Sequence, residues 1–262
     1  MKTKKFLLTS DWHLDATSHG VERSIELREG LSSILKAITK FGVDTFVHLG
    51  DLCDADSPDV LRHLAIVAGF ERCLHSLGVT SYWMNGNHDV NSDGTFTTMP
   101  LAAGYGASTK YIFAPTVVDS PVDDFRLMFI PYPGGISYEL PLLNKPVTNV
   151  EQWVKQYLYS PANKDRKSPL LVFSHLSVMG MPVGEESKEM ARGKDVTLPL
   201  AVFEKYARDT YVPVKVFQGH YHQRQVFNKN SLVPIQVVGS PARFTQLHSN
   251  QTNPGFLIYE QG

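Results

Sequence analysis

Cysteine is scarce in this chain, since the 262 residues contain only Cys53 and Cys73. Two cysteines are too few for a disulfide framework, which indicates a reducing compartment. Long apolar runs are also lacking: no stretch approaches the ~20 apolar residues of a membrane span. The apolar run at residues 6–8 is far too short for a signal peptide. We therefore expect a cytoplasmic protein with no membrane partner.

An excess of charge of either sign is missing as well. Lys plus Arg number 25 and Asp plus Glu number 26, which gives a formal net charge of −1. Bulk charge therefore does not hold this chain on nucleic acid, although a local basic groove remains possible. Hydrophobic residues make up 42% and charged residues 19% of the chain, a balance that excludes a disordered or fibrous protein.

Apolar periodicity predicts alternating strands and helices in the first third of the chain. The predicted order is strand 6–9, helix 23–41, strand 43–49, helix 57–77 and strand 79–84. We expect Ser57 to cap the second helix, with Pro58 at its first helical position. Gly42 and Gly78 are each expected to end a helix. This alternation is typical of a parallel α/β sheet with right-handed crossovers.

The rest of the chain has a less regular pattern. Further strands are predicted at 126–131, 170–174, 214–217, 224–227, 233–238 and 255–259, with helices over 149–159 and 200–208. Residues 91–106 indicate a loop or broken helix, and residues 178–197 a surface loop. No internal repeat or linker interrupts the sequence, so we predict one domain over residues 1–262.

Five predicted strands each end in side chains that can bind a metal ion. Carboxyl ends of strands in an open α/β sheet converge on one crevice, so we expect these side chains to meet. The candidate ligands are Asp11, His13, Asp51, Asn87, His175, His220 and His222.

The ligand types favour a pair of transition metal ions. Imidazoles with carboxylates, and no cysteine ligand, suit Mn, Fe, Zn, Co or Ni rather than Mg or Ca. Seven ligands are too many for one ion, whereas two divalent ions about 3.5–4 Å apart that share a carboxylate fit. Two such ions against only Asp11 and Asp51 leave positive charge, which suits a phosphate oxygen. We expect manganese at both positions.

The ordered motifs Asp-x-His, Gly-Asp-x-x-Asp, Gly-Asn-His-Asp, a lone His and Gly-His-x-His, within residues 6–222, resemble those of the calcineurin-like metallophosphoesterase superfamily. The resemblance implies an α/β fold, a four-layer α-β-β-α sandwich with two mixed sheets. It implies one ion held by Asp11, His13, Asp51 and His222, and a second held by Asp51, Asn87, His175 and His220. His88 would act as general acid or transition-state stabiliser, and Asp54 would orient it through a hydrogen bond.

Within that superfamily the chain is most similar to the SbcD-type DNA exonucleases, through residues 9–14, residues 50–58 and Gly239-Ser240-Pro241. Those nucleases carry a C-terminal capping domain for DNA and a segment that docks an ATPase partner. The sequence ends about twenty residues after Pro241, which argues against duplex DNA binding and against an ATPase partner.

The leading hypothesis is therefore a phosphodiesterase that hydrolyses DNA, most naturally a single strand. A phosphodiesterase or pyrophosphatase for a small nucleotide, such as a cyclic nucleotide, is the alternative that the near-zero net charge favours. A non-enzymatic scaffold is disfavoured, because every ligand and His88 are present.

Several residues near the motifs are expected to be structural. Trp12 is predicted to wall the site rather than stack a base, and Cys53 to be a small buried hydrophobe. His48 is expected to pack inside its strand. Arg243 is a candidate phosphate contact. Surface positions are predicted for His19, His63, His75 and His248.

Overall fold

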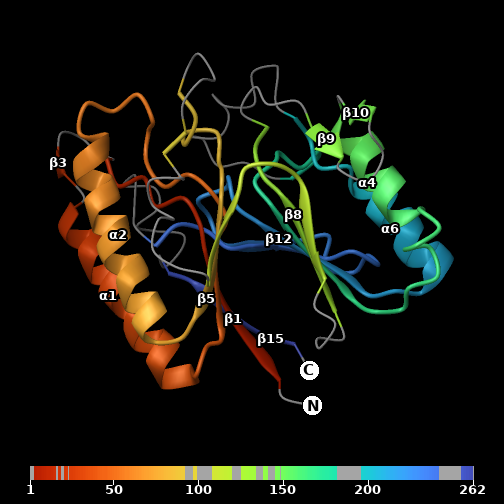
Figure 1. The fold of residues 1–262 in the computed structure, drawn as a ribbon, viewed down its shortest axis with the longest axis horizontal. Helices are drawn as coiled ribbons and strands as arrows, with labels where there is room; N and C mark the ends of the chain where they lie inside the picture. Colours follow the sequence, from red (N-terminus) through yellow and green to blue (C-terminus); the bar gives the residue numbers. More distant parts are fainter. Residues whose placement is uncertain are drawn as a thin grey trace.

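The computed structural model describes residues 3–15, 17–18, 21–22, 24–91, 97–98, 108–119, 125–133, 138–140, 145–147, 149–181, 196–241 and 255–261. Two mixed β-sheets lie side by side in the middle of the molecule, and helices cover the outer face of each sheet (Figure 1). The predicted α/β sandwich of four layers is confirmed.

The first sheet has the strand order β15-β1-β4-β5-β6, in which β15 runs antiparallel to β1 and the other neighbours are parallel. Its strands are β1 (Lys4–Thr9), β4 (Thr45–His48), β5 (Thr80–Met84), β6 (Thr109–Ile112) and β15 (Leu257–Gln261). Its outer face carries α1 (Ser24–Phe41) and α2 (Val60–Ser76).

The second sheet has the order β13-β14-β12-β11-β8-β7, with parallel strands at its centre and antiparallel ones at both edges. Its strands are β7 (Thr116–Asp119), β8 (Arg126–Ile130), β11 (Leu170–Ser174), β12 (Val214–Gln218), β13 (Gln225–Phe227) and β14 (Ile235–Val237). Helices α4 (Val150–Leu158) and α6 (Leu200–Thr210) cover it. Two short pairs complete the described elements: β2 (Thr17–Ser18) with β3 (Val21–Glu22), and β9 (Tyr138–Leu140) with β10 (Lys145–Val147).

Aromatic rings between the sheets fix the strand register. Phe129, Phe173 and Phe217 occupy matched positions on three parallel strands. Their rings stack at centroid distances of 5.0 Å and 5.4 Å. Such stacked pairs stabilise beyond the area they bury. Because the register is fixed, the carboxyl ends of β8, β11 and β12 lie level with one another.

The start of α2 differs from the prediction. The helix begins at Val60 after Asp59, and the side chain of Asp59 makes no capping hydrogen bond. Ser57 lies in the preceding turn, where its carbonyl accepts the Val60 amide at 3.2 Å. Ser57 is therefore not the cap and Pro58 is not the first helical residue. The predicted helix start therefore lies two residues too early.

Strands β6 and β7 are absent from the sequence prediction. Neither strand is fully buried, and a mixture of exposed and half-buried positions gives no clear apolar period. Edge strands of this kind are defined by their hydrogen-bonded neighbours β5 and β8 rather than by their own sequence.

Several predictions lie outside the described residues. These are most of the loops 91–106 and 178–197, together with His19, His248 and Arg243. Among the described histidines His75 is exposed, as expected, whereas His63 is buried, and its surface prediction is wrong. None of the helices in the described part of the chain has the length and apolarity to cross a bilayer.

Trp12, in the loop after β1, and His48, on β4, are buried at the end of the first sheet, where Trp12 also contacts Phe70 of α2. Trp12 is fully buried, and its indole N–H donates to Thr9 Oγ1 at 2.8 Å, so no base can stack on it. The His48 ring lies 4.9 Å from Trp12 and 5.3 Å from Trp83, and neither ring nitrogen has a hydrogen-bond partner among the described residues. Burial, with the charge of His175 adding to it, lowers the pKa of His48 from 6.5 to about 3.

This low pKa predicts a specific acid sensitivity of the fold. Below pH 6.5 the unfolded chain takes up a proton at His48 that the folded chain refuses, so the free energy of unfolding falls as the pH falls. His48→Phe removes this proton. Between pH 7 and pH 5 we expect the free energy of unfolding of the variant to fall by about 2 kcal/mol less than that of the wild type.

The measurement is urea unfolding of metal-stripped protein at both pH values. His75→Phe, at an exposed position, is the control for loss of an imidazole. Parallel pH profiles of wild type and His48→Phe would contradict the prediction.

Candidate metal centre

Among the described non-glycine residues, most of those with a left-handed backbone are predicted ligands. Six described non-glycine residues have positive φ, and four of them are Asp11 (53°), His13 (41°), Asp51 (58°) and His220 (69°). A left-handed conformation of this kind disfavours side chains with a Cβ and costs about 1–3 kcal/mol. Backbone strain concentrated at these positions indicates a functional site.

Neighbouring loops hold these strained turns in place. The Asp11 amide donates to the Gly50 carbonyl at 2.9 Å, and the His13 amide donates to the Asp51 carbonyl at 3.1 Å. The loop after β1 is therefore tied to the loop after β4, which brings the first two motifs together.

The first group of ligand atoms combines Asp11, His13 and His222, all within 4.8 Å of one another. His222 Nε2 lies 3.9 Å from Asp11 Oδ1. The rings of His13 and His222 are 5.1 Å apart between centroids. The group joins the end of β1 to the loop after β12.

The second group combines Asp51, His175 and His220, again within 4.8 Å of one another. Asn87 lies beside it, because its Oδ1 is 3.2 Å from His175 Nε2 and 3.0 Å from His220 Nδ1. The structure therefore brings all seven predicted ligands to one edge of the sheets.

Asp51 lies between the two groups. Its Oδ2 is 3.1 Å from His175 Nε2, in the second group, and 3.7 Å from His13 Nε2, in the first. A carboxylate in this position can contact two cations at once, which is the arrangement of a dinuclear site.

Electrostatics favour an ionised Asp51. Burial alone would raise the pKa of this carboxyl, but the adjacent His175 and the imidazoles of His88 and His13 hold it well below its usual range. Burial would likewise lower the pKa of His175, but Asp51 outweighs it and raises that pKa to about 9 in the metal-free protein. Burial raises the pKa of Asp11, an effect that His175 and His222 only partly offset.

His175 is oriented by the backbone. Its Nδ1 lies 2.6 Å from the Leu49 carbonyl, which can only accept a hydrogen bond. Nδ1 must therefore carry a proton, and in the neutral ring Nε2 is left as the lone-pair donor that faces Asp51 and Asn87. Orientation of a ligand imidazole by a carbonyl on its other nitrogen is the usual arrangement in metal sites.

The residues fit divalent cations. Asp11 is fully buried, and neither of its carboxylate oxygens has a hydrogen-bond partner among the described residues. A buried carboxylate without donors is unfavourable unless a cation compensates it. The surrounding imidazole, carboxylate and amide donors are ligands of Mn, Fe and Zn, and they fit a pair of such ions.

Close contact between loops requires glycine at two positions. A Cβ on Gly86 would lie 2.1 Å from Asp51 Oδ1, and one on Gly50 would lie 2.5 Å from His175 Nδ1. Gly50 also has a φ of 105°. The glycines of Gly-Asp and Gly-Asn-His-Asp therefore let the ligand loops pack against each other.

Asp89 is a site residue whose role the sequence pattern does not predict. It is fully buried, and its Oδ2 accepts the amides of Asp51 at 2.8 Å and Gly86 at 2.7 Å. Its Oδ1 accepts the amide of Leu52 at 2.8 Å and the hydroxyl of Thr98 at 3.3 Å. One carboxylate thus clamps the β4 loop to the β5 loop, and its place in Gly-Asn-His-Asp is the signal that could have revealed it.

His88 stands at the edge of the ligand groups. Its ring lies 4.9 Å from the His13 ring, its amide donates to Asp51 Oδ1 at 2.9 Å, and its buried Nε2 has no hydrogen-bond partner among the described residues. Asp54 Oδ1 accepts the amide of Asp56 at 2.9 Å, and no hydrogen bond joins Asp54 to His88 in the described structure. The orienting role of Asp54 stays a prediction.

The Gly-Ser-Pro segment has a structural role behind the ligands. Ser240 Oγ donates to the Asp11 carbonyl at 2.7 Å, and the Ser240 amide donates to the His222 carbonyl at 3.2 Å. Two members of the first group are therefore held by one buried serine.

A two-sheet α/β sandwich with paired ligand groups at its strand ends defines the class of protein. Residues 4–224 match the family model described as calcineurin-like phosphoesterase, and the chain belongs to that family.

Solved structures resemble the fold. A dimetal phosphatase from Danio rerio superimposes with a TM-score of 0.58 at 14% identity, over 90% of this chain and 87% of that one. The protein TT1561 of Thermus thermophilus gives a TM-score of 0.49 at 12% identity, over 91% and 90%. The first of these supports the sandwich fold of this chain.

The clamp by Asp89 can be tested with Asp89→Asn. The amide keeps the shape, but it turns an N–H₂ group toward backbone donors and loses the charge. We expect the free energy of unfolding to fall by about 2–4 kcal/mol. We also expect the affinity for Mn²⁺ to fall about 10–100-fold, because the loops that carry Asp51 and Asn87 separate. Chemical denaturation and titration calorimetry of stripped protein measure both.

Asp59→Asn is the matched control, since Asp59 is exposed and its side chain caps nothing. Thr98→Val, which removes one donor to Asp89, should give the same changes at smaller size. A folded Asp89→Asn variant with wild-type Mn²⁺ affinity would show that the clamp does not position the ligands.

Proposed function

We propose that this protein is a dinuclear-metal phosphodiesterase whose substrate is DNA, cleaved as a nuclease. The position of Asp51 between two ligand groups is the observation that carries the proposal. In this proposal Asp11, His13, Asp51 and His222 hold one divalent ion, and Asp51, Asn87, His175 and His220 the other. Bound there, the two ions would supply Lewis acidity toward a phosphate and a nucleophile near neutral pH.

The residues of the chain have separate tasks in this reaction. Asp51 and Asp11 provide the negative charge that draws cations into a buried site, and the Leu49 carbonyl keeps His175 turned toward Asp51. His88 donates a proton to the leaving oxygen, a role supported by its place beside His13 and by its unpartnered Nε2.

Manganese is our proposed metal, and the cytoplasm our proposed compartment. The mixed imidazole and carboxylate donors support the first, and the two unpaired cysteines, Cys53 buried and Cys73 exposed, support the second.

DNA as substrate rests on the similarity of the Gly50–Pro58 segment and of Gly239-Ser240-Pro241 to SbcD-type nucleases. A small cyclic nucleotide is the competing substrate, favoured by the net charge of −1. Stripped protein reloaded with Mn²⁺ should cleave a labelled single-stranded oligonucleotide with a kcat/KM at least 10-fold above that for a cyclic nucleotide. The reverse order would assign the small-nucleotide activity, and cleavage of neither would refute the phosphodiesterase.

His88→Ala tests the proposed acid. We expect the rate on the oligonucleotide to fall about 10²-fold or more, because a positioned general acid contributes at least that much. Mn²⁺ stoichiometry measured by calorimetry should stay unchanged, since His88 is outside both ligand groups. His63→Ala, at a buried histidine on α2, is the control. A rate within a factor of two of wild type would remove His88 from the mechanism.

A further inference from the structure

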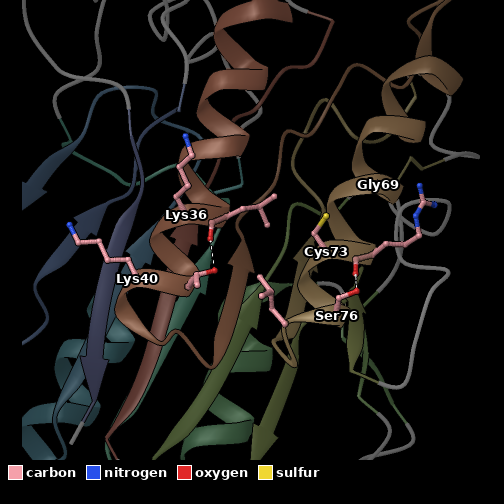
Figure 2. Close-up of a pocket in the computed structure, with 9 residues that line it drawn as sticks. Lys36, Lys40, Gly69, Cys73 and Ser76 are labelled. Carbon is pink, nitrogen blue, oxygen red and sulfur yellow. Dashed lines mark hydrogen bonds between the residues drawn. The ribbon is translucent and has the colours of Figure 1, made fainter.

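A hollow of about 910 Å³ lies on the outer surface of the helical layer, between α1 and α2 (Figure 2). The second halves of both helices line it. Each helix begins after the carboxyl end of a strand and runs back along the sheet, so these last turns lie at the end of the sheet away from the ligands. The hollow is therefore separate from the metal centre.

The floor of this hollow is apolar. Leu35, Cys73 and Leu77 line it, and 47% of Leu77 is exposed to solvent. The two hydroxyls among its described lining residues are bonded to their own helices: Thr39 Oγ1 donates to the Leu35 carbonyl at 3.2 Å, and Ser76 Oγ donates to the Arg72 carbonyl at 2.8 Å (Figure 2). The floor therefore offers apolar surface rather than hydrogen bonds to an occupant.

Gly69 in the middle of α2 has no explanation among the described residues. A glycine in a helix interior costs about 1 kcal/mol relative to alanine. A Cβ at Gly69 would meet only the tip of Arg72, at 3.7 Å, among the described residues. The fold itself does not require glycine here, whereas a chain that packs closely against α2 would.

Positive charge flanks the apolar floor. Lys36 and Lys40 on α1 and Arg72 on α2 line the hollow, and the described residues of its lining include no Asp or Glu. Figure 2 shows Lys36 and Lys40 extending away from α2, along the outer side of α1. A phosphate chain would need cations in the floor. An amphipathic helix with apolar residues along its centre and carboxylates along its sides matches what is present.

We propose that this hollow docks an acidic amphipathic helix of a partner protein. The lining on α2 runs from Gly69 to the C-cap residue Leu77, about 12 Å along the helix axis, and accommodates two to three turns of a partner helix. Apolar anchors at i, i+3, i+4 and i+7 face Leu35 and Leu77, with the backbone close to Gly69. Carboxylates beside them face the three cations, which gives salt-dependent association.

Cys73 provides a direct reporter of occupancy. It is exposed and lines the hollow, whereas Cys53 is buried and its thiol pKa is raised by burial and by Asp89. A maleimide therefore reacts at Cys73. A synthetic 18-residue helical peptide, with leucines on one face and glutamates along its sides, should slow this reaction with saturable dependence on peptide concentration. A scrambled peptide of the same composition should not.

Two variants of the hollow test separately how its positive charge and its apolar floor contribute to peptide binding. Lys36→Glu with Lys40→Glu should weaken peptide binding at least 10-fold, whereas Lys164→Glu with Lys229→Glu, an equal charge change at exposed positions on the second-sheet side, should not. Gly69→Leu fills the floor. We expect it to unfold at the same or a higher temperature, because leucine is the better helix former, yet to bind the peptide at least 10-fold more weakly.

Protection of Cys73 by the scrambled peptide, or unchanged binding by a folded Gly69→Leu variant, would overturn the proposal. Stronger protection by a single-stranded oligonucleotide would assign the hollow to nucleic acid instead. Protection by rising concentration of the chain itself, with dimers in sedimentation, would assign it to a second copy. Hydrolysis of bis(p-nitrophenyl) phosphate should be the same in every variant, so failure of this proposal is distinguishable from failure of the proposed phosphodiesterase.

Discussion

The Asp51 carboxylate is the interaction on which the metal centre depends. Its two oxygens meet imidazoles from the ends of β1 and β11 and the backbone of the loop after β5. One side chain thus defines where three strand ends can lie relative to each other. Without a cation the group already favours the ionised state, because His175 and its neighbours lower its pKa against the effect of burial. The protein is therefore prepared for cation binding before any ion arrives.

Four of the ligand residues have a strained, left-handed backbone, and hydrogen bonds from surrounding polar groups compensate for this strain. Asp51 has a left-handed backbone, and its amide is held by Asp89. Asp89 is itself unfavourable in isolation: burial, with the nearby charge of Asp51, raises its pKa to about 7. Backbone amides from two loops and the Thr98 hydroxyl stabilise its charged form. The carboxylates of Asp51 and Asp89 repel each other. The hydrogen bonds that Asp89 accepts offset this repulsion and fix the geometry of the loops.

The ligands could be predicted from sequence because each follows an apolar run, and sheet topology brings strand ends together. The position of Asp89 in Gly-Asn-His-Asp marks it as a site residue, but its clamping role could not be predicted, since its main partners are backbone amides, which leave no side-chain pattern. The burial of Trp12 beneath the site depends on contacts with Phe46, Phe70 and Trp83 that come from other elements. The predicted start of α2 is two residues early because Ser57 and Pro58 fit a cap by composition alone. In the structure the Ser57 amide donates to the Asp54 carbonyl and the Ser57 carbonyl accepts the Val60 amide, so Ser57 belongs to the turn that precedes the helix.

Helices α1 and α2 each have an inner face that packs on the first sheet and an outer surface that does not. Their inner faces pack on the sheet through residues such as Ile34, Val67 and Leu74, and this packing holds the strands that end in the ligands. Their outer surface carries Gly69 and the cationic side chains of Lys36, Lys40 and Arg72, which line the hollow. A partner bound there contacts no ligand loop. It could change the chemistry only if it bound two states of the centre with different affinity, so tethering is the simpler consequence. The fold thus allows recruitment and hydrolysis to vary independently.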